Sequence, residues 1–130
     1  MYVRRTPSPR MVRQELDMSC GAACARQLLL DVGVHMPESV LRERASFDPV
    51  NGISAKSLGA LLSALHEGVS YDAGAVFPEH LGTLICRAPF LALLGTPRGR
   101  HWIIVDGLSD GLVEARDPCG IPEVEATTCG

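Results

Sequence analysis

The sequence contains very little lysine and few aromatic residues. Lys56 is its single lysine, and only 5% of its 130 residues are Phe, Trp or Tyr. Its arginines are scattered, so it lacks the basic face and the aromatic ladder that are typical of nucleic-acid-binding proteins. A net charge of −3 and an apolar fraction of 46% indicate an ordinary globular chain. We therefore expect no nucleic-acid partner.

Long hydrophobic runs are also missing. The longest apolar stretches are about six residues, whereas a helix needs roughly 20 to cross a bilayer. Residues 1–13 carry four arginines but no apolar segment of the kind found in secretory signal peptides. We expect no membrane span and a cytoplasmic location, in the cell of origin or in a target cell. A chain of 130 residues is expected to form one domain around one core.

The cysteines do not form a recognisable framework. An odd number leaves at least one cysteine free or paired with another chain, which favours a reducing compartment. Cys20 and Cys24 have a spacing seen in zinc sites, with His101 and Cys119 as further ligands, but no second pair with this spacing recurs. We therefore expect no metal and no cofactor. No role is assigned to the remaining positions Cys86, Cys119 and Cys129.

The order of the predicted elements indicates an α+β fold. Residues 1–13, with two prolines, predict an extended arm or linker, and residues 14–130 a single domain. Helices first and an antiparallel sheet second are typical of this class. Helices are predicted at about 20–32, 37–44 and 54–65, with one more turn at 78–85. Strands are predicted at 89–95, 101–108 and 112–117, with a hairpin turn at 109–111.

Four residues that can carry chemistry occur in a defined order. Cys20 opens the first helix, where the helix dipole favours the thiolate that acts as a nucleophile. His101 opens a strand and is the candidate general base and acid, and Asp117 ends the next strand and would orient the imidazole. Gln14, six residues before Cys20, would stabilise an oxyanion together with the Cys20 N–H. Gly21 would let a substrate backbone approach the sulfur.

The predicted hairpin allows the pair of His101 and Asp117 to be tested. If the loop is centred on Ser109, these two residues lie directly opposite each other, with Cβ atoms about 5 Å apart on one face. Asp106 is five residues from His101, so strand alternation places it on the other face. A loop with an even number of residues would shift the register by one. This pattern assigns the carboxylate to Asp117.

These motifs resemble those of the papain-like peptidases that remove double-glycine leader peptides. The resemblance covers about residues 14–120. The family forms processing domains of bacteriocin-exporting transporters, and papain-fold toxin domains, some of them glutamine deamidases, share the same motif set. The matching strings are Gln14 to Cys24, Gly52-Ile53-Ser54, His101 to Val105 and Asp117 to Gly120.

The resemblance implies a papain-like fold and a cysteine hydrolase that acts on peptide or side-chain amides. It puts Cys20, His101 and Asp117 in the triad and Gln14 in the oxyanion position. Peptidase and glutamine deamidase share these residues, and a catalytically idle peptide-binding module is the other alternative. Implied partners are a peptide or protein substrate, a fused transporter or toxin module, or an immunity protein. The family usually continues with more strand after its Asp-Pro, for which only residues 123–127 are available here.

Overall fold

A mixed four-stranded sheet forms the centre of the protein. The computed structural model describes residues 3–5, 10–75, 77–97 and 99–119. The predicted last strand at 123–127 lies outside these residues. Strands β2, β3 and β4 are antiparallel, whereas β1 pairs in parallel with β4. In sheet order the strands are β1 (Val3–Arg5), β4 (Leu112–Arg116), β3 (Gly99–Ser109) and β2 (Phe90–Thr96).

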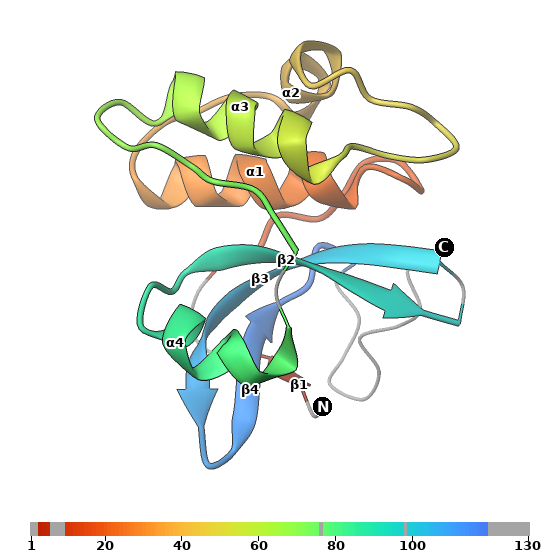
Figure 1. Cartoon of the computed structure of the whole chain (residues 1–130). Helices are drawn as coiled ribbons and strands as arrows, with labels where there is room; N and C mark the ends of the chain where they lie inside the picture. Colours follow the sequence, from red (N-terminus) through yellow and green to blue (C-terminus); the bar gives the residue numbers. More distant parts are fainter. Residues whose placement is uncertain (1–2, 6–9, 76, 98, 120–130) are drawn as a thin grey trace.

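Helices cover both faces of this sheet (Figure 1). On one face lie α1 (Cys20–Asp31), α2 (Glu38–Arg44) and α3 (Ala55–Leu65). On the other face lie the short η1 (Pro78–His80) and α4 (Leu81–Ile85). The predicted α+β class and the predicted helices are confirmed. Among the described residues, no helix is both long and apolar enough to cross a membrane.

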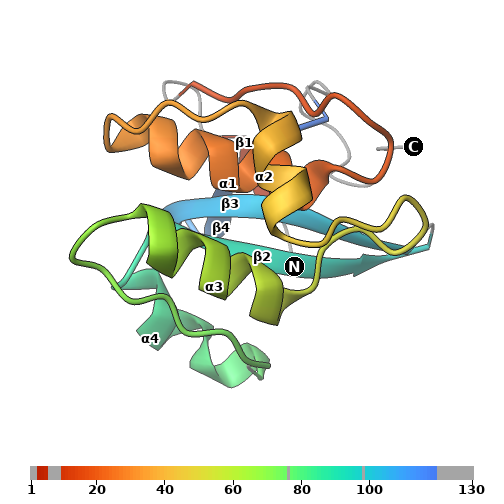
Figure 2. The ribbon, with the colours of Figure 1, turned by 90° about the horizontal axis from the view of Figure 1, so that it is seen from above.

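The helix ends follow from local chemistry. The Ser54 side chain accepts the Ser57 N–H at 3.2 Å and so caps α3, as its sequence predicts. Helix α1 ends before Gly33, whose φ of 84° is readily adopted only by a residue without Cβ. These signals fix the two helices that pack over the sheet (Figure 2).

Alternate residues of β3 face two separate apolar cores. Trp102 and Ile104 pack under α1 and α3, in a cluster that includes Leu29, Leu58 and Leu62. Ile103 and Val105 face the side of the sheet that carries α4, where they meet Val113, Ala115, Leu81 and Ile85.

The N-terminal arm is part of the domain rather than a separate linker. Val3–Arg5 form β1 and add an edge strand beside β4. Further along, the Val12 N–H donates to Gln27 Oε1 at 2.8 Å. The prediction of an extended segment is right, but its description as an arm or linker is corrected for these described positions, because pairing satisfies backbone groups that a linker leaves to water.

The hairpin between β3 and β4 differs from its prediction. Asp110 and Gly111 form a two-residue turn with φ angles of 53° and 75°, and Ser109 pairs with Leu112. Positive φ at both turn positions matches the twist of the flanking strands. The prediction of a loop centred on Ser109 is therefore wrong.

An extra residue in β3, Asp106, brings His101 and Asp117 to the same face of the sheet. The pairing set by the turn would leave Asp117 opposite Ile104, on the other face from His101. The bulge at Asp106 shifts the register by one, so the position opposite Asp117 becomes that of Ile103. Ile103 and His101 share a face because they are two residues apart. Asp117 and His101 are therefore diagonal neighbours, and the prediction of direct opposition is corrected.

Arg116 fixes this bulge from inside the protein. Its guanidinium donates two hydrogen bonds of 2.9 Å to the Asp106 carboxylate, one of 2.9 Å to Asp31 and one of 2.9 Å to the Arg10 carbonyl. Burial opposes the charge of Arg116, but the two carboxylates outweigh it and raise its pKa. Asp106 thus pairs with Arg116. The prediction that Asp106 is not the carboxylate partner of His101 agrees with this pair.

We expect Asp106→Ala to lower the free energy of unfolding by about 3 kcal/mol. Removing one partner of a buried ion pair typically costs ~3–5 kcal/mol, and Asp31 still holds the Arg116 guanidinium, which keeps the loss at the low end. Urea unfolding of the variant measures this loss, with the exposed Glu67→Ala as the control. A loss no larger than that of Glu67→Ala would contradict the structural role of Asp106.

Candidate active site

The first turn of α1 lies against β3 where the ladder to β4 has ended. The last β3–β4 pair is Ile104 with Arg116. Two residues earlier, the Trp102 N–H donates to Cys20 Sγ at 3.5 Å, and Cys24 Sγ–H donates to the Trp102 carbonyl at 3.5 Å. Sulfur atoms of α1 therefore satisfy backbone groups that β4 leaves unpaired, and this contact fixes Cys20 beside the start of β3.

The glycine after Cys20 serves this close packing. A Cβ on Gly21 would lie 3.0 Å from Trp102 Cδ1 and 3.2 Å from Leu58 Cδ1. The Trp102 indole is fixed in turn by a 3.1 Å hydrogen bond from its Nε1 to the Ile53 carbonyl. Gly21 is buried, so its role in the described structure is helix-to-sheet packing rather than the predicted approach of a substrate backbone.

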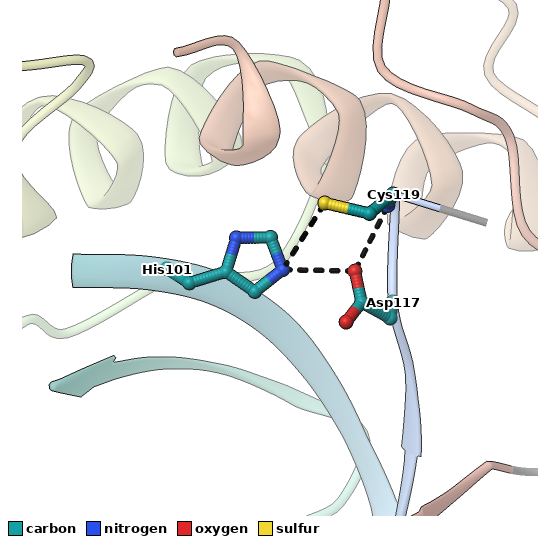
Figure 3. Close-up of side chains that lie close together, drawn as sticks. All are labelled: His101, Asp117 and Cys119. Carbon is teal, nitrogen blue, oxygen red and sulfur yellow. Dashed lines mark hydrogen bonds and ion pairs between the residues drawn. The ribbon is translucent and has the colours of Figure 1, made fainter. Parts of the chain in front are cut away.

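His101 and Asp117 form a direct pair (Figure 3). His101 Nε2 donates to Asp117 Oδ1 at 2.8 Å, and both side chains are buried. The same oxygen accepts the Cys119 N–H at 2.8 Å, which locks the carboxylate over the turn that follows β4. The sequence therefore placed the carboxylate partner of His101 correctly, although the register that it assumed was wrong.

Cys20 lies beside the residue that follows His101, because its Sγ accepts the Trp102 N–H, and it acts on the pKa of the imidazole. Burial alone would lower the pKa of His101, but the hydrogen bonds and negative charge of Asp117 and Cys20 outweigh it and raise the pKa to about 9. The pair of His101 and Asp117 thus lies beside Cys20, and the raised pKa of the ring favours its imidazolium form.

Cys24 differs from Cys20 although it lies one turn further along α1. It has no exposed surface, and burial, together with the charges of Cys20 and Asp117, raises the pKa of its thiol well above the ordinary value. A thiol that keeps its proton is the form that donates to the Trp102 carbonyl. Cys24 is therefore structural.

Gln14 lies beside the Asp117 turn, next to the pair of Figure 3. Its backbone N–H donates to the Pro118 carbonyl at 2.8 Å. Its side-chain Nε2 donates to the carbonyls of Leu16 and Asp17 at 2.8 and 2.9 Å. The amide thus reaches the site region, but its two hydrogens bind the loop that leads to Cys20, so its predicted role in oxyanion binding stays a prediction.

We expect Gln14→Ala to lower kcat by about 10²–10³-fold with KM nearly unchanged, the usual effect of losing one oxyanion donor. Steady-state kinetics measure both constants, and the rate of Cys20 alkylation serves as the control for an intact nucleophile. Slower alkylation together with a changed KM would instead show that Gln14 only ties down its loop.

The sulfur of Cys119 completes a cluster around His101 Nε2. Cys119 Sγ lies 3.7 Å from that nitrogen and 3.5 Å from Gln14 Oε1. His101, Asp117 and Cys119 together have the spacing of metal ligands. A metal would need a thiolate, however, and the Cys119 sulfur is disulfide-bonded. The cluster in the described residues does not join Cys20 and Cys24 to His101, so it does not support the zinc alternative.

Three cysteines of the described residues are free: Cys20, Cys24 and Cys86. The expectation was that at least one cysteine is free or pairs with another chain, and these three are free. Cys86 lies at the end of α4 and is exposed, in contrast to the two buried thiols of α1.

The other histidines stand apart from this cluster. His35 and His80 are exposed, and His66 Nδ1 lies 2.7 Å from the Tyr71 hydroxyl. His66 is thus half-buried and paired. Glu38 is a buried carboxylate of α2 that contacts the segment before Cys20, and no sequence pattern singles it out. Its spacing of four residues from Arg42 is that of an ordinary surface ion pair.

Comparison with known proteins gives no relative from which a function could be transferred. No protein-family model matches the sequence, and no curated protein matches it either.

Proposed function

We propose that the protein is a papain-like cysteine hydrolase that acts on peptide or side-chain amide bonds. The observation that carries this proposal is the buried pair of His101 and Asp117 next to Cys20, whose Sγ accepts the N–H of the residue that follows His101. The sulfur lies at a helix N-terminus, the imidazole is held by a buried carboxylate, and the pKa of about 9 favours the imidazolium form of the ring.

The reaction follows from these positions. The Cys20 thiolate forms a bond to the amide carbonyl carbon, and the carbonyl oxygen becomes an oxyanion that the Cys20 N–H and the Gln14 amide would stabilise. Collapse breaks the C–N bond, and the leaving nitrogen takes its proton from His101. Neutral His101 then removes a proton from water, which attacks the thioester and releases the carboxylic acid and the Cys20 sulfur. Asp117 orients the ring throughout.

The same steps cleave a peptide bond or deamidate a glutamine side chain, depending on which amide enters the site. The leaving group is a new peptide amine in the first reaction and ammonia in the second. Incubation with a glutamine-containing peptide that carries a double-glycine motif separates them, because mass spectrometry detects the fragments and an ammonia assay detects the deamidation. Cys20→Ala is the control for either activity.

Alkylation distinguishes the enzyme from an idle peptide-binding module. Cys86 is an exposed free thiol in the same chain and so provides an internal reference for Cys20, which is only 7% exposed. With iodoacetamide at pH 6–7, an activated Cys20 is expected to react faster than Cys86 despite its lower exposure. Slower reaction of Cys20, together with the absence of both products, would overturn the proposal in favour of the binding module.

A further inference from the structure

The segment that leads into Cys20 is closed on itself by hydrogen bonds. The Ser19 hydroxyl oxygen accepts the Leu16 N–H at 2.9 Å, and the Ser19 hydroxyl and backbone N–H reach back to the Leu16 carbonyl at 3.0 and 3.2 Å. The Gln14 amide donates to the same carbonyl. The backbone around Cys20 and the Gln14 side chain therefore form one tight loop, and a shift of any part moves the rest.

One buried carboxylate anchors the start of this loop. Glu38, in the first turn of α2, has no exposed surface. Its Oε1 accepts the Glu15 N–H at 3.1 Å. Its Oε2 is paired with Arg42 Nη1 at 2.9 Å. Glu38 thus holds the residue after Gln14, at the start of the loop that the Ser19 hydroxyl closes onto Leu16.

A carboxylate in this place costs free energy unless it is fully paired. Burial raises the pKa of Glu38, and the hydrogen bonds from Glu15 and Ser19 and the charge of Arg42 only partly offset that rise. The Glu15 side chain extends the network outwards, 3.6 Å from Arg42 and 3.9 Å from Arg26. An apolar side chain at position 38 would pack α2 against α1 equally well. Packing alone therefore does not explain why a paired carboxylate occupies this position.

We propose that Glu38 is a positioning residue that sets the loop from Gln14 to Ser19, and with it the oxyanion donors, in register with Cys20. This inference rests on the proposed hydrolase function. Through the Glu15 N–H it fixes the backbone from which the Gln14 amide extends. The hydrogen bonds between Leu16 and Ser19 carry this position on to the peptide unit with the Cys20 N–H. A displacement of about 1 Å at such donors is enough to cost roughly 10²-fold in rate.

Kinetics of Glu38→Ala test this role. We expect kcat to fall by about 10²-fold while KM and the alkylation rate of Cys20 change little, because the donors act mainly in the transition state. Glu38→Gln keeps an oxygen that can accept the Glu15 N–H and should recover part of the loss. Glu43→Ala, an exposed change on the same helix, is the matched control and should leave kcat unchanged.

A second variant keeps the test decisive if Glu38→Ala fails to fold. Ser19→Ala removes one hydroxyl contact of the same network with little loss of volume, and it should also lower kcat with KM unchanged. In a Gln14→Ala background, the change at Glu38 or Ser19 should add much less than it does alone, because the two act through the same donors. Additive losses in kcat would overturn the positioning role.

Hydrogen exchange of the Glu15 amide separates this inference from the proposed function. Faster exchange in Glu38→Gln or Glu38→Ala than in Glu43→Ala supports the anchor, whether or not the wild-type protein shows turnover. Absence of turnover in the wild type with faster exchange would count against the hydrolase alone. Turnover in the wild type with kcat unchanged in the Glu38 and Ser19 variants would overturn the positioning role alone.

Discussion

Cys20→Ala is expected to abolish turnover while the fold persists. Loss of the nucleophile of a comparable triad costs about 10⁶-fold in kcat. The change removes one sulfur at the surface of the apolar core, where the side chain is 7% exposed, so cooperative unfolding should remain. Product assays and thermal unfolding on the same sample measure the two effects.

The same variant makes a prediction that needs no substrate. The hydrogen bond and charge of Cys20 are among the causes that raise the pKa of His101 to about 9. Cys20→Ala should therefore lower the pKa of His101, and NMR titration of the imidazole measures this directly. An unchanged His101 titration would mean that sulfur and ring do not interact as described.

Cys24→Ala is the matched control on the same helix. It removes the donor to the Trp102 carbonyl and leaves a small void at a fully buried position, so a modest loss of stability is expected, about 1 kcal/mol. Turnover should remain. If Cys24→Ala lost turnover without unfolding and Cys20→Ala kept it, the nucleophile would have been assigned to the wrong cysteine.

The second large effect concerns the charge of His101. The imidazolium that protonates the leaving nitrogen is present below its pKa of about 9, so kcat/KM should fall as the pH rises through about 9. Asp117→Asn removes the negative charge beside the ring. The fall in kcat/KM should therefore occur at lower pH, and turnover should be slower. His101→Ala should abolish turnover, whereas changes at His35, His66 and His80 should not.

Stability should follow the same titration. The pKa of His101 in the folded protein lies above its ordinary value near 6.5. The corresponding stabilisation is therefore fully present below about pH 6.5 and is lost as the pH rises through 9. Urea unfolding between pH 6 and 10 should show this loss in the wild type and less of it in Asp117→Asn. Equal pH dependence in both proteins would contradict the His101–Asp117 pair.

Much of the fold could be predicted because local signals decide it. Ser54 caps its helix, Gly33 ends another, and the leucine spacing of α3 sets its buried face. The strand register could not be predicted, since it depends on a two-residue turn and on a bulge at Asp106 that Arg116 stabilises from elsewhere in the structure. The pair of His101 and Asp117 was identified although the geometry assumed for it was wrong.

The role of Glu38 in the loop before Cys20 could not be predicted from the sequence for a different reason. Glu38 and Arg42 form a pair at i and i+4, which usually lies in solvent, and nothing local shows that this one is buried against Ser19 and Glu15. Its position results from the packing of α2 on α1. Gly21 was misread in a similar way, because its neighbour Trp102 is 81 residues away in the chain.

The hydrogen bond from the Trp102 N–H to Cys20 Sγ makes this amide a spectroscopic reporter of the sulfur. Its proton chemical shift should move when Cys20 changes between thiol, thiolate and thioester, because each state is a different acceptor. The indole Nε1–H of the same residue donates to the Ile53 carbonyl and so supplies a reference signal that this chemistry leaves in place. Since the chain contains one tryptophan, selective labelling would follow an acyl intermediate through its lifetime with two peaks.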